Sequence, residues 1–184
     1  MKRSFHKLVI SSNVEDRGKP ILLICNHTSW WDGIWALHLN QQKFRRKFHF
    51  MMLEEQLKKN WFFKYTGGFS VRKSDRSVVE SLNYAAELLE NKNNLVLMFP
   101  QGKIQSMHRR AFIFEKGIER ILKRTKNEVE LVFEVNLVDY FSQAKPSVYL
   151  NAISYSGEYS LTAVQEAYNA FYRECIQQQE KKEV

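Results

Sequence analysis

The stretch His27-Thr28-Ser29-Trp30-Trp31-Asp32 sets an imidazole and a carboxylate five positions apart, one residue beyond the apolar run Ile21–Cys25. A carboxylate bound to one imidazole nitrogen fixes the tautomer and leaves the other nitrogen free to accept a proton. Positions five apart on one helix point to different sides, so the pair meets only if His27 lies in a strand-to-helix loop. Asp32 then belongs to the first helical turn, where side chains lean back toward the N-terminus. The spacing therefore predicts a general-base pair.

A structural interpretation of the same residues exists. Ser29-x-x-Asp32 also matches the capping-box pattern of a helix N-terminus, and a single His is most often structural. His27 and Asp32 together at the end of a strand favour chemistry, and the capping and orienting roles of Asp32 are compatible.

The block Asn26-His27-x-Ser29-x-x-Asp32 resembles the signature of the glycerolipid (lysophospholipid) acyltransferase superfamily, whose hallmark is His-x-x-x-x-Asp. Three further blocks follow in the order of that family: Gly68–Arg72, Phe99–Ser106 and Phe114–Gly117. The resemblance implies catalytic roles for His27 and Asp32. It also implies substrate-binding roles for a larger set of residues: Asn26, Ser29, Arg72, Gln101, Gly102 and Lys103.

The third block departs from the family pattern Phe-Pro-Glu-Gly-Thr-Arg-Ser. Gln101 replaces the Glu, Lys103 the Thr and Ile104 the Arg, and the later strand Val129–Leu137 lacks the family's Pro. A Lys lacks the planar fork with which Arg binds phosphate in a bidentate manner. We therefore expect lysophosphatidate to be a poor acceptor relative to an uncharged or less charged lipid alcohol. A glycolipid, an aminoacyl lipid and a pigment precursor are alternative acceptors.

The resemblance implies an O-acyltransferase that moves a fatty acyl group from acyl-CoA or acyl carrier protein to a hydroxyl of a lipid acceptor. The thioester is a co-substrate, and no cofactor and no metal are expected, because no metal-ligand cluster appears in the sequence. Two other classes remain open: a non-catalytic lipid- or acyl-thioester-binding relative, and a basic nucleic-acid-binding protein. The sequence has no recognisable nucleic-acid-binding motif, so nucleic acid is not an expected partner.

The composition is that of a globular protein with a basic surface. The 184 residues are 44% hydrophobic and 26% charged, with a formal net charge of +8, which suits an anionic membrane surface, coenzyme A phosphates or an acidic carrier protein. Cys25 and Cys175 fall in apolar patterns and are expected to be reduced core thiols. No signal peptide or spanning segment is apparent. We expect a cytoplasmic protein, peripheral to the inner face of the membrane. Lys43–Lys47 and Trp61–Tyr65 either contact lipid, or place Phe44 and Trp61 in the core with the cations as a solvated rim.

The hydrophobic pattern predicts one α/β domain over residues 1–184, with the catalytic blocks within 21–117. Strands alternate with helices, which predicts an α/β sandwich whose mixed, mostly parallel sheet is flanked by helices, as in glycerol-3-phosphate acyltransferase. Apolar residues at every odd position of Val129–Leu137 predict a strand with one more polar face. Val78, Val79, Leu82, Ala85, Ala86 and Leu89 predict one core stripe on a helix. A last helix is expected from Leu161, with fraying from Gln177 onward.

Overall fold

Along the part of the chain that the structure describes, seven strands form one sheet at the centre of the molecule. The computed structural model describes residues 4–59, 67–71, 75–125 and 129–183. The strands are β1 (Leu8–Asn13), β2 (Ile21–Cys25), β3 (Lys47–Leu53), β4 (Gly68–Val71), β5 (Asn94–Met98), β6 (Glu130–Asp139) and β7 (Ser147–Tyr155). The helices are α1 (Asp32–Lys43), α2 (Glu54–Lys59), α3 (Asp75–Leu88), α4 (Gly117–Thr125) and α5 (Leu161–Glu180).

The order of the strands is β1-β7-β6-β2-β5-β3-β4. Every neighbouring pair is parallel except β6 and β7, which form an antiparallel hairpin. The predicted mixed, mostly parallel α/β sheet is thus confirmed. β2 lies in the interior of this sheet between β5 and β6, and all five of its residues are buried. The residue that follows β2 therefore starts from a fixed position at the carboxyl edge of the sheet, where functional groups of α/β proteins gather.

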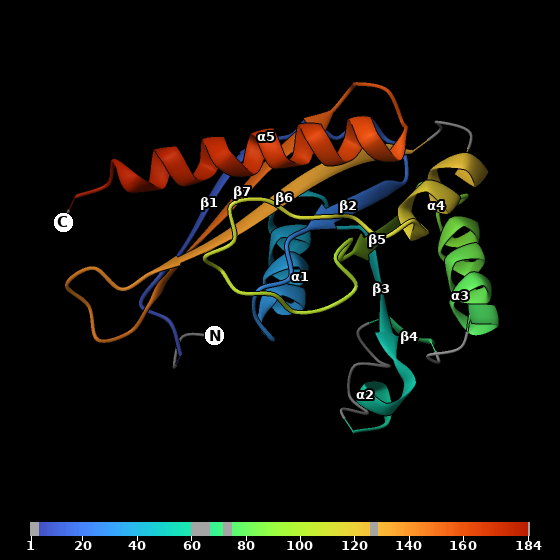
Figure 1. Ribbon diagram of the computed structural model, residues 1–184, viewed down its shortest axis with the longest axis horizontal. Helices are drawn as coiled ribbons and strands as arrows, with labels where there is room; N and C mark the ends of the chain where they lie inside the picture. Colours follow the sequence, from blue (N-terminus) through green and yellow to red (C-terminus); the bar gives the residue numbers. More distant parts are fainter. Residues whose placement is uncertain (1–3, 60–66, 72–74, 126–128, 184) are drawn as a thin grey trace.

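Helices cover both faces of the sheet (Figure 1). On one face, apolar side chains of α3, α4 and α5 pack on Leu22, Ile24 and Phe133. On the other face, Trp35 and Leu39 of α1 pack on Leu23 and Val132. Because both faces are covered, a strand in the middle of this sheet has no solvated side.

The strand predicted at Val129–Leu137 is β6, and its more polar face is buried by this coverage. Its first eight residues are all buried, including Glu134 at 0% exposure and Asn136 at 3%.

Two other predictions, on α3 and on α5, need correction. Val78 and Val79 are 36% and 37% exposed, so the core stripe of α3 begins only at Leu82.

The second of these corrections concerns α5, which does not fray at Gln177 but continues to Glu180. The extra turn is held because buried Gln179 donates from Nε2 to Asp139 Oδ2 at 2.7 Å. At its other end, Ser160 caps α5 by accepting a hydrogen bond from the Ala163 amide at 3.3 Å. Such a cap contributes about 1 kcal/mol.

Gly67 is required by the close approach of β4 to β3. Its φ is +91°, and a Cβ at this position would lie 1.8 Å from the carbonyl oxygen of Phe48. Only glycine fits here.

Candidate active site

His27 lies in the loop between β2 and α1, and Asp32 is the first residue of α1. Nδ1 of His27 is 3.1 Å from Oδ2 of Asp32. A carboxylate oxygen only accepts hydrogen bonds, so Nδ1 carries the hydrogen and Nε2 is the basic nitrogen. Within the described part of the chain, Nε2 makes no hydrogen bond. The predicted contact is therefore present, and the geometry leaves one ring nitrogen available to a substrate.

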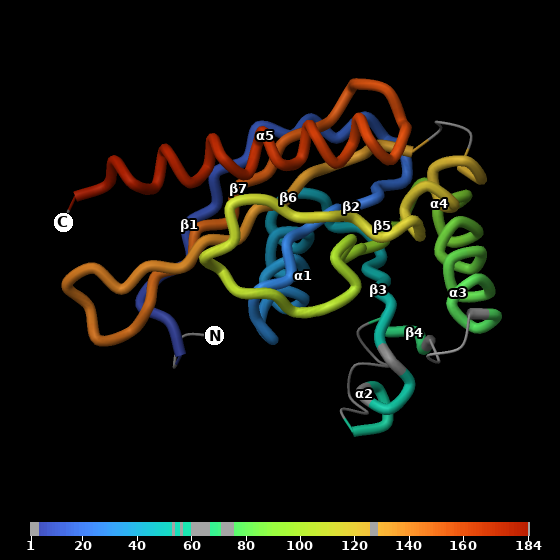
Figure 2. The backbone as a smooth tube through the Cα atoms, in the orientation of Figure 1, coloured from blue at the N-terminus to red at the C-terminus, as the bar shows by residue number. Residues whose placement is uncertain are grey.

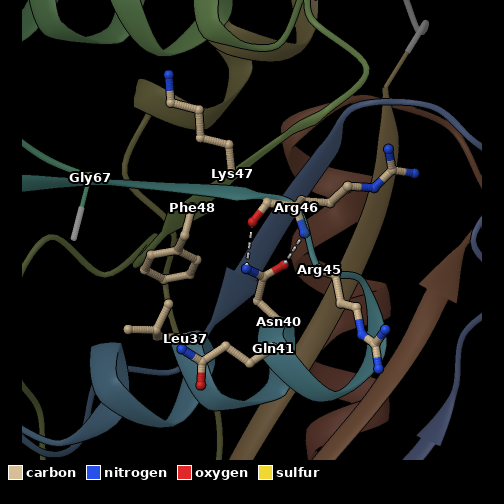
Figure 3. A pocket seen from close by; sticks show the side chains of 8 residues that line it. All are labelled: Leu37, Asn40, Gln41, Arg45, Arg46, Lys47, Phe48 and Gly67. Atoms are coloured by element: carbon tan, nitrogen blue, oxygen red, sulfur yellow. Dashed lines mark hydrogen bonds between the residues drawn. The ribbon is translucent and has the colours of Figure 1, made fainter. Parts of the chain in front are cut away.

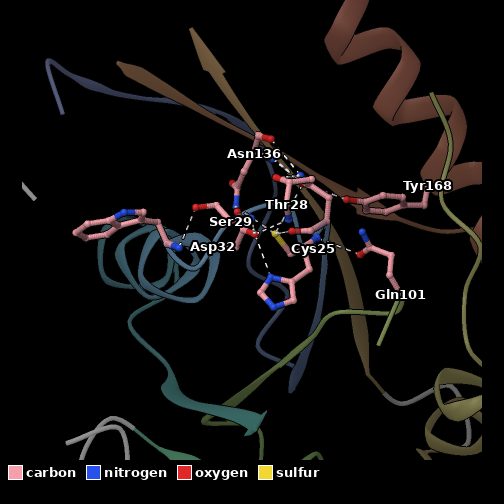
Figure 4. Close-up of polar contacts among 10 residues, drawn as sticks. Cys25, Thr28, Ser29, Asp32, Gln101, Asn136 and Tyr168 are labelled. Carbon is pink, nitrogen blue, oxygen red and sulfur yellow. Dashed lines mark hydrogen bonds and ion pairs between the residues drawn. The ribbon is translucent and has the colours of Figure 1, made fainter. Parts of the chain in front are cut away.

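Asp32 is held in place by the loop that it faces. Its Oδ2 also accepts hydrogen bonds from the amides of Thr28 and Ser29, each at 2.7 Å, and the side chain is fully buried. Figure 4 shows Asp32 beside these two residues at the start of α1. The two amides hold the carboxylate in the orientation that contacts the imidazole, so the pair is preorganised.

The Ser29 amide has its hydrogen-bond partner within the loop. It donates to Asp32 and is therefore not available to stabilise an oxyanion. The Ser29 hydroxyl accepts from the Trp31 amide at 3.1 Å. Ser29 is thus part of the support of Asp32. The reciprocal capping box is not complete, because the N-cap of α1 is Trp31, which has no side-chain cap hydrogen bond.

The loop after β5 clamps the His27 backbone from the other side. Oε1 of Gln101 accepts from the His27 amide at 3.0 Å, and the Gln105 amide donates to the His27 carbonyl at 2.8 Å. The imidazole stacks on the Phe99 ring with centroids 4.0 Å apart and 11° between the planes. The third block therefore positions the base.

The other predicted binding residues are placed differently. Asn26 is buried, and its Oδ1 accepts from the Asn136 amide at 2.8 Å. Gly102 has a positive φ of 65° in the turn after Gln101. Lys103 is exposed, with no described contact to the His27–Asp32 pair. Arg72 lies outside the described residues.

Asn136 is a site residue that sequence reasoning missed. Its Nδ2 lies 3.5 Å from Asp32 Oδ1 and 3.2 Å from Cys25 Sγ. The only signal in the sequence is an amide on the supposed polar face of β6, where several residues are polar. Tyr168 of α5 completes this layer, because its hydroxyl donates to the Glu134 carbonyl at 2.8 Å.

A buried carboxyl group lies directly behind the pair. Glu134 is fully buried, and neither of its side-chain oxygens has a partner among the described residues. Burial, reinforced by the negative charge of Asp32, raises the pKa of Glu134 well above its usual range. Of the two carboxyls, Asp32 has the donors that stabilise an anion and Glu134 has none. Glu134 is therefore the one that holds a proton.

Cys25 is not a nucleophile at this site. The thiol is fully buried, and burial, with the neighbouring Glu134 and Asp32, raises its pKa well above the usual range. Cys175 is also buried and unpaired, and burial raises its pKa to about 12. Both are core thiols, as predicted. Within the described ranges, no three His, Cys, Asp or Glu side chains group so as to hold a metal ion.

Two hollows lie at different ends of the sheet. One, of about 370 Å³, is bounded by Asn26, Thr28 and Asn136 and extends along the C-terminal part of α5. The other, of about 420 Å³, lies at the opposite ends of the strands and is lined by Arg45, Arg46 and Lys47 (Figure 3). Arg46 is already bound to Asp16 and to the Lys92 carbonyl.

The fold and the paired imidazole and carboxylate at the edge of its sheet define an α/β protein equipped for general-base chemistry. The acyltransferase family model matches residues 7–139, and the chain belongs to that family. This match confirms the resemblance to the glycerolipid acyltransferase superfamily. No curated protein and no solved structure matches the chain. Along the described residues, no helix is both long and apolar enough to cross a bilayer.

Proposed function

We propose that this acyltransferase moves a fatty acyl group from an acyl thioester, carried by coenzyme A or by acyl carrier protein, to a hydroxyl of a lipid acceptor. The observation that supports the proposal is the fixed His27–Asp32 pair, in which Nδ1 is bonded to the carboxylate and Nε2 has no hydrogen bond within the described residues. Two amides hold the carboxylate and the Gln101 loop holds the His27 backbone. A residue with only a packing role needs none of this support.

In the proposed reaction, Nε2 of His27 takes the proton of the acceptor hydroxyl as the oxygen attacks the thioester carbonyl carbon. The carbon–sulfur bond then breaks, and the departing thiolate takes the proton back from the imidazolium. Asp32 stabilises the imidazolium in between and remains ionised. Base catalysis of this kind contributes about 10²–10⁴-fold to the rate.

The experiment is to incubate the purified protein with acyl-CoA or acyl carrier protein and total lipid, and to identify acylated products by mass spectrometry. His27→Ala is expected to abolish thioester consumption while the far-ultraviolet circular dichroism remains that of the folded protein. Asp32→Asn keeps an oxygen for the Thr28 and Ser29 amides but removes the charge that stabilises the imidazolium. We expect a loss of about 10²-fold or more. Near-normal turnover in both variants contradicts the mechanism and leaves a lipid-binding role.

We further propose that the protein works at the inner, anionic face of a membrane and approaches it with the edge that carries His27. Figure 2 follows the irregular segment 99–116 from β5 to α4 along this side. This segment exposes large apolar side chains, with Ile104 at 55% and Ile113 at 78% exposure, next to exposed Arg109 and Arg110. Exposed apolar groups interleaved with cations suit an anionic lipid interface.

The predicted contact through Lys43–Lys47 is a weaker candidate. This stretch lies at the amino ends of the parallel strands, because Lys47 opens β3 opposite Asn94, which opens β5. His27 follows the carboxyl end of β2. A bilayer bound at Lys43–Lys47 therefore lies at the end of the sheet opposite to His27. The second predicted stretch, Trp61–Tyr65, lies outside the described residues.

A further inference from the structure

The cavity of about 370 Å³ starts next to the catalytic loop. Thr28, which lines its near end, is the neighbour of His27 in the chain, and the Thr28 amide binds Asp32. The cavity continues between the end of β6 and the last turns of α5, with Met107 and His108 of the segment 99–116 on a third side. Its position suits the part of an acceptor that is adjacent to the reacting hydroxyl.

Asn136, which lines the near end of this cavity, has one side-chain atom without a hydrogen-bond partner among the described residues. Asn136 is 3% exposed, and its Oδ1 has no partner among the described residues. Its Nδ2 is already directed at Cys25 and Asp32. A buried amide oxygen without a donor is costly, and a ligand hydroxyl supplies one. An ionised phosphate carries only acceptor oxygens and leaves this atom unpaired.

The far end of the cavity is not built for an anion. Asp139 and Glu180 contribute two carboxylates and Lys182 one ammonium, so carboxylates outnumber the Lys and Arg cations that line the cavity. Lys182 is already engaged, since its Nζ is 2.6 Å from Gln179 Oε1 and 3.7 Å from the centre of the Tyr149 ring.

The arginines of the neighbouring loop do not change this balance. Arg109 and Arg110 are exposed and do not line the cavity. A dianionic phosphate in the cavity faces two carboxylates and finds one partly satisfied cation, whereas phosphate sites usually offer several well-placed donors.

We propose that this cavity binds the uncharged, hydroxyl-rich head group of the acceptor lipid, a glycerol or sugar alcohol without phosphate. The assignment rests on the proposed acyl transfer to a lipid hydroxyl and names the class of acceptor that the enzyme selects. Selection comes from the unpaired Asn136 oxygen, which favours a donor, and from Asp139 and Glu180, which repel a phosphate.

Binding tests the assignment without turnover. The His27→Ala protein is titrated with monohexanoylglycerol and, separately, with the same compound carrying a 3-phosphate, at one ionic strength, by ligand-observed nuclear magnetic resonance. The two probes share one tail and differ only in the phosphate. We expect the phosphate-free compound to bind at least tenfold more tightly. Equal or tighter binding of the phosphate compound overturns the assignment.

A variant of the cavity locates the effect. In the same background, Asp139→Asn combined with Glu180→Gln removes both carboxylate charges, and we expect the preference for the phosphate-free compound to fall to less than threefold. Glu166→Gln removes an exposed charge on the same helix but outside the cavity, and the preference should stay at tenfold or more. A double variant that keeps the full preference shows that another surface discriminates, and the assignment is then wrong.

The two proposals fail in different ways. If the wild-type protein consumes no acyl thioester with any acceptor while the binding preference and its loss in the double variant hold, acyl transfer is wrong and the head-group site stands. If thioester is consumed with lysophosphatidate as the best acceptor, acyl transfer stands and the head-group site is overturned.

Discussion

The unpaired Glu134 predicts that the stability of the protein falls as the pH rises. Burial raises the pKa of this carboxyl well above its usual value of 4.5. Between the usual pKa and the higher folded pKa, the unfolded chain has released the proton while the folded chain keeps it, so the folded state binds more protons in that window. Stability from this group is complete below the usual pKa and is lost as the pH rises toward the folded pKa.

The size of this effect follows from proton linkage. One proton changes the unfolding equilibrium constant tenfold for each pH unit within that window, and about 1 kcal/mol shifts the Tm of a domain of this size by roughly 2–4 °C. Glu134→Gln keeps the shape and removes the titration. We expect the variant to gain about 3–5 °C in Tm over the wild type for each pH unit above 5.

Thermal unfolding followed by circular dichroism at several pH values between 5 and 8 measures the difference. Glu166→Gln, an exposed position on α5, is the control and should show no pH-dependent difference from the wild type. A Glu134→Gln curve that runs parallel to that of the wild type shows that Glu134 is ionised in the folded state, and the reasoning from its missing partners is then refuted.

Three further changes probe the support of the site, the membrane face and the layer behind the dyad. Gln101→Ala removes the acceptor of the His27 amide, and we expect kcat to fall about fivefold to tenfold with little change in KM. Arg109→Glu with Arg110→Glu should weaken binding to anionic vesicles at least tenfold in a sedimentation assay, and salt should weaken wild-type binding. Tyr168→Phe removes a buried hydrogen bond and should cost about 1–2 kcal/mol in chemical denaturation.

Each of these has its own contrary result. A Gln101→Ala enzyme with wild-type kcat means that the loop does not position the base. The control is Arg45→Glu with Lys47→Glu, which makes the same change of charge at the other end of the sheet. If both double variants lose vesicle binding equally, the edge that carries His27 is not the membrane-binding face. If the free energy of unfolding of Tyr168→Phe equals that of the wild type, the hydrogen bond of this hydroxyl adds no net stability over the one it makes with water in the unfolded chain.

The sequence predicts those features that depend on short stretches of chain. The pairing of His27 with Asp32 follows from their spacing and from the strand before them. The range of β2 matches the apolar run Ile21–Cys25, because an unbroken apolar run is a local pattern.

Features that depend on how distant segments meet were not predictable. The polar residues of β6 look solvated in the sequence, and only the positions of α1 and α5 on opposite faces show that Glu134 and Asn136 are buried. The clamp of Gln101 on His27 joins residues 74 positions apart, and no local pattern encodes it. The family's Glu at this position suggests a ligand for substrate, whereas the amide here binds the backbone of the base.

The strand order also determines when, during synthesis, the β-sheet can be completed. Of the described strands, β1 is made before the others, and its neighbour among them is β7, so that Leu8 waits for Val148. The inner strand β2 likewise gains one of its two neighbours only when β6 appears. Until then a nascent chain exposes unpaired strand edges, which favours association with other chains. Contacts between distant residues also slow folding. In a newly made chain of this protein, the sheet is therefore completed late in synthesis. The chain should benefit from a chaperone that covers the unpaired strand edges of its N-terminal half.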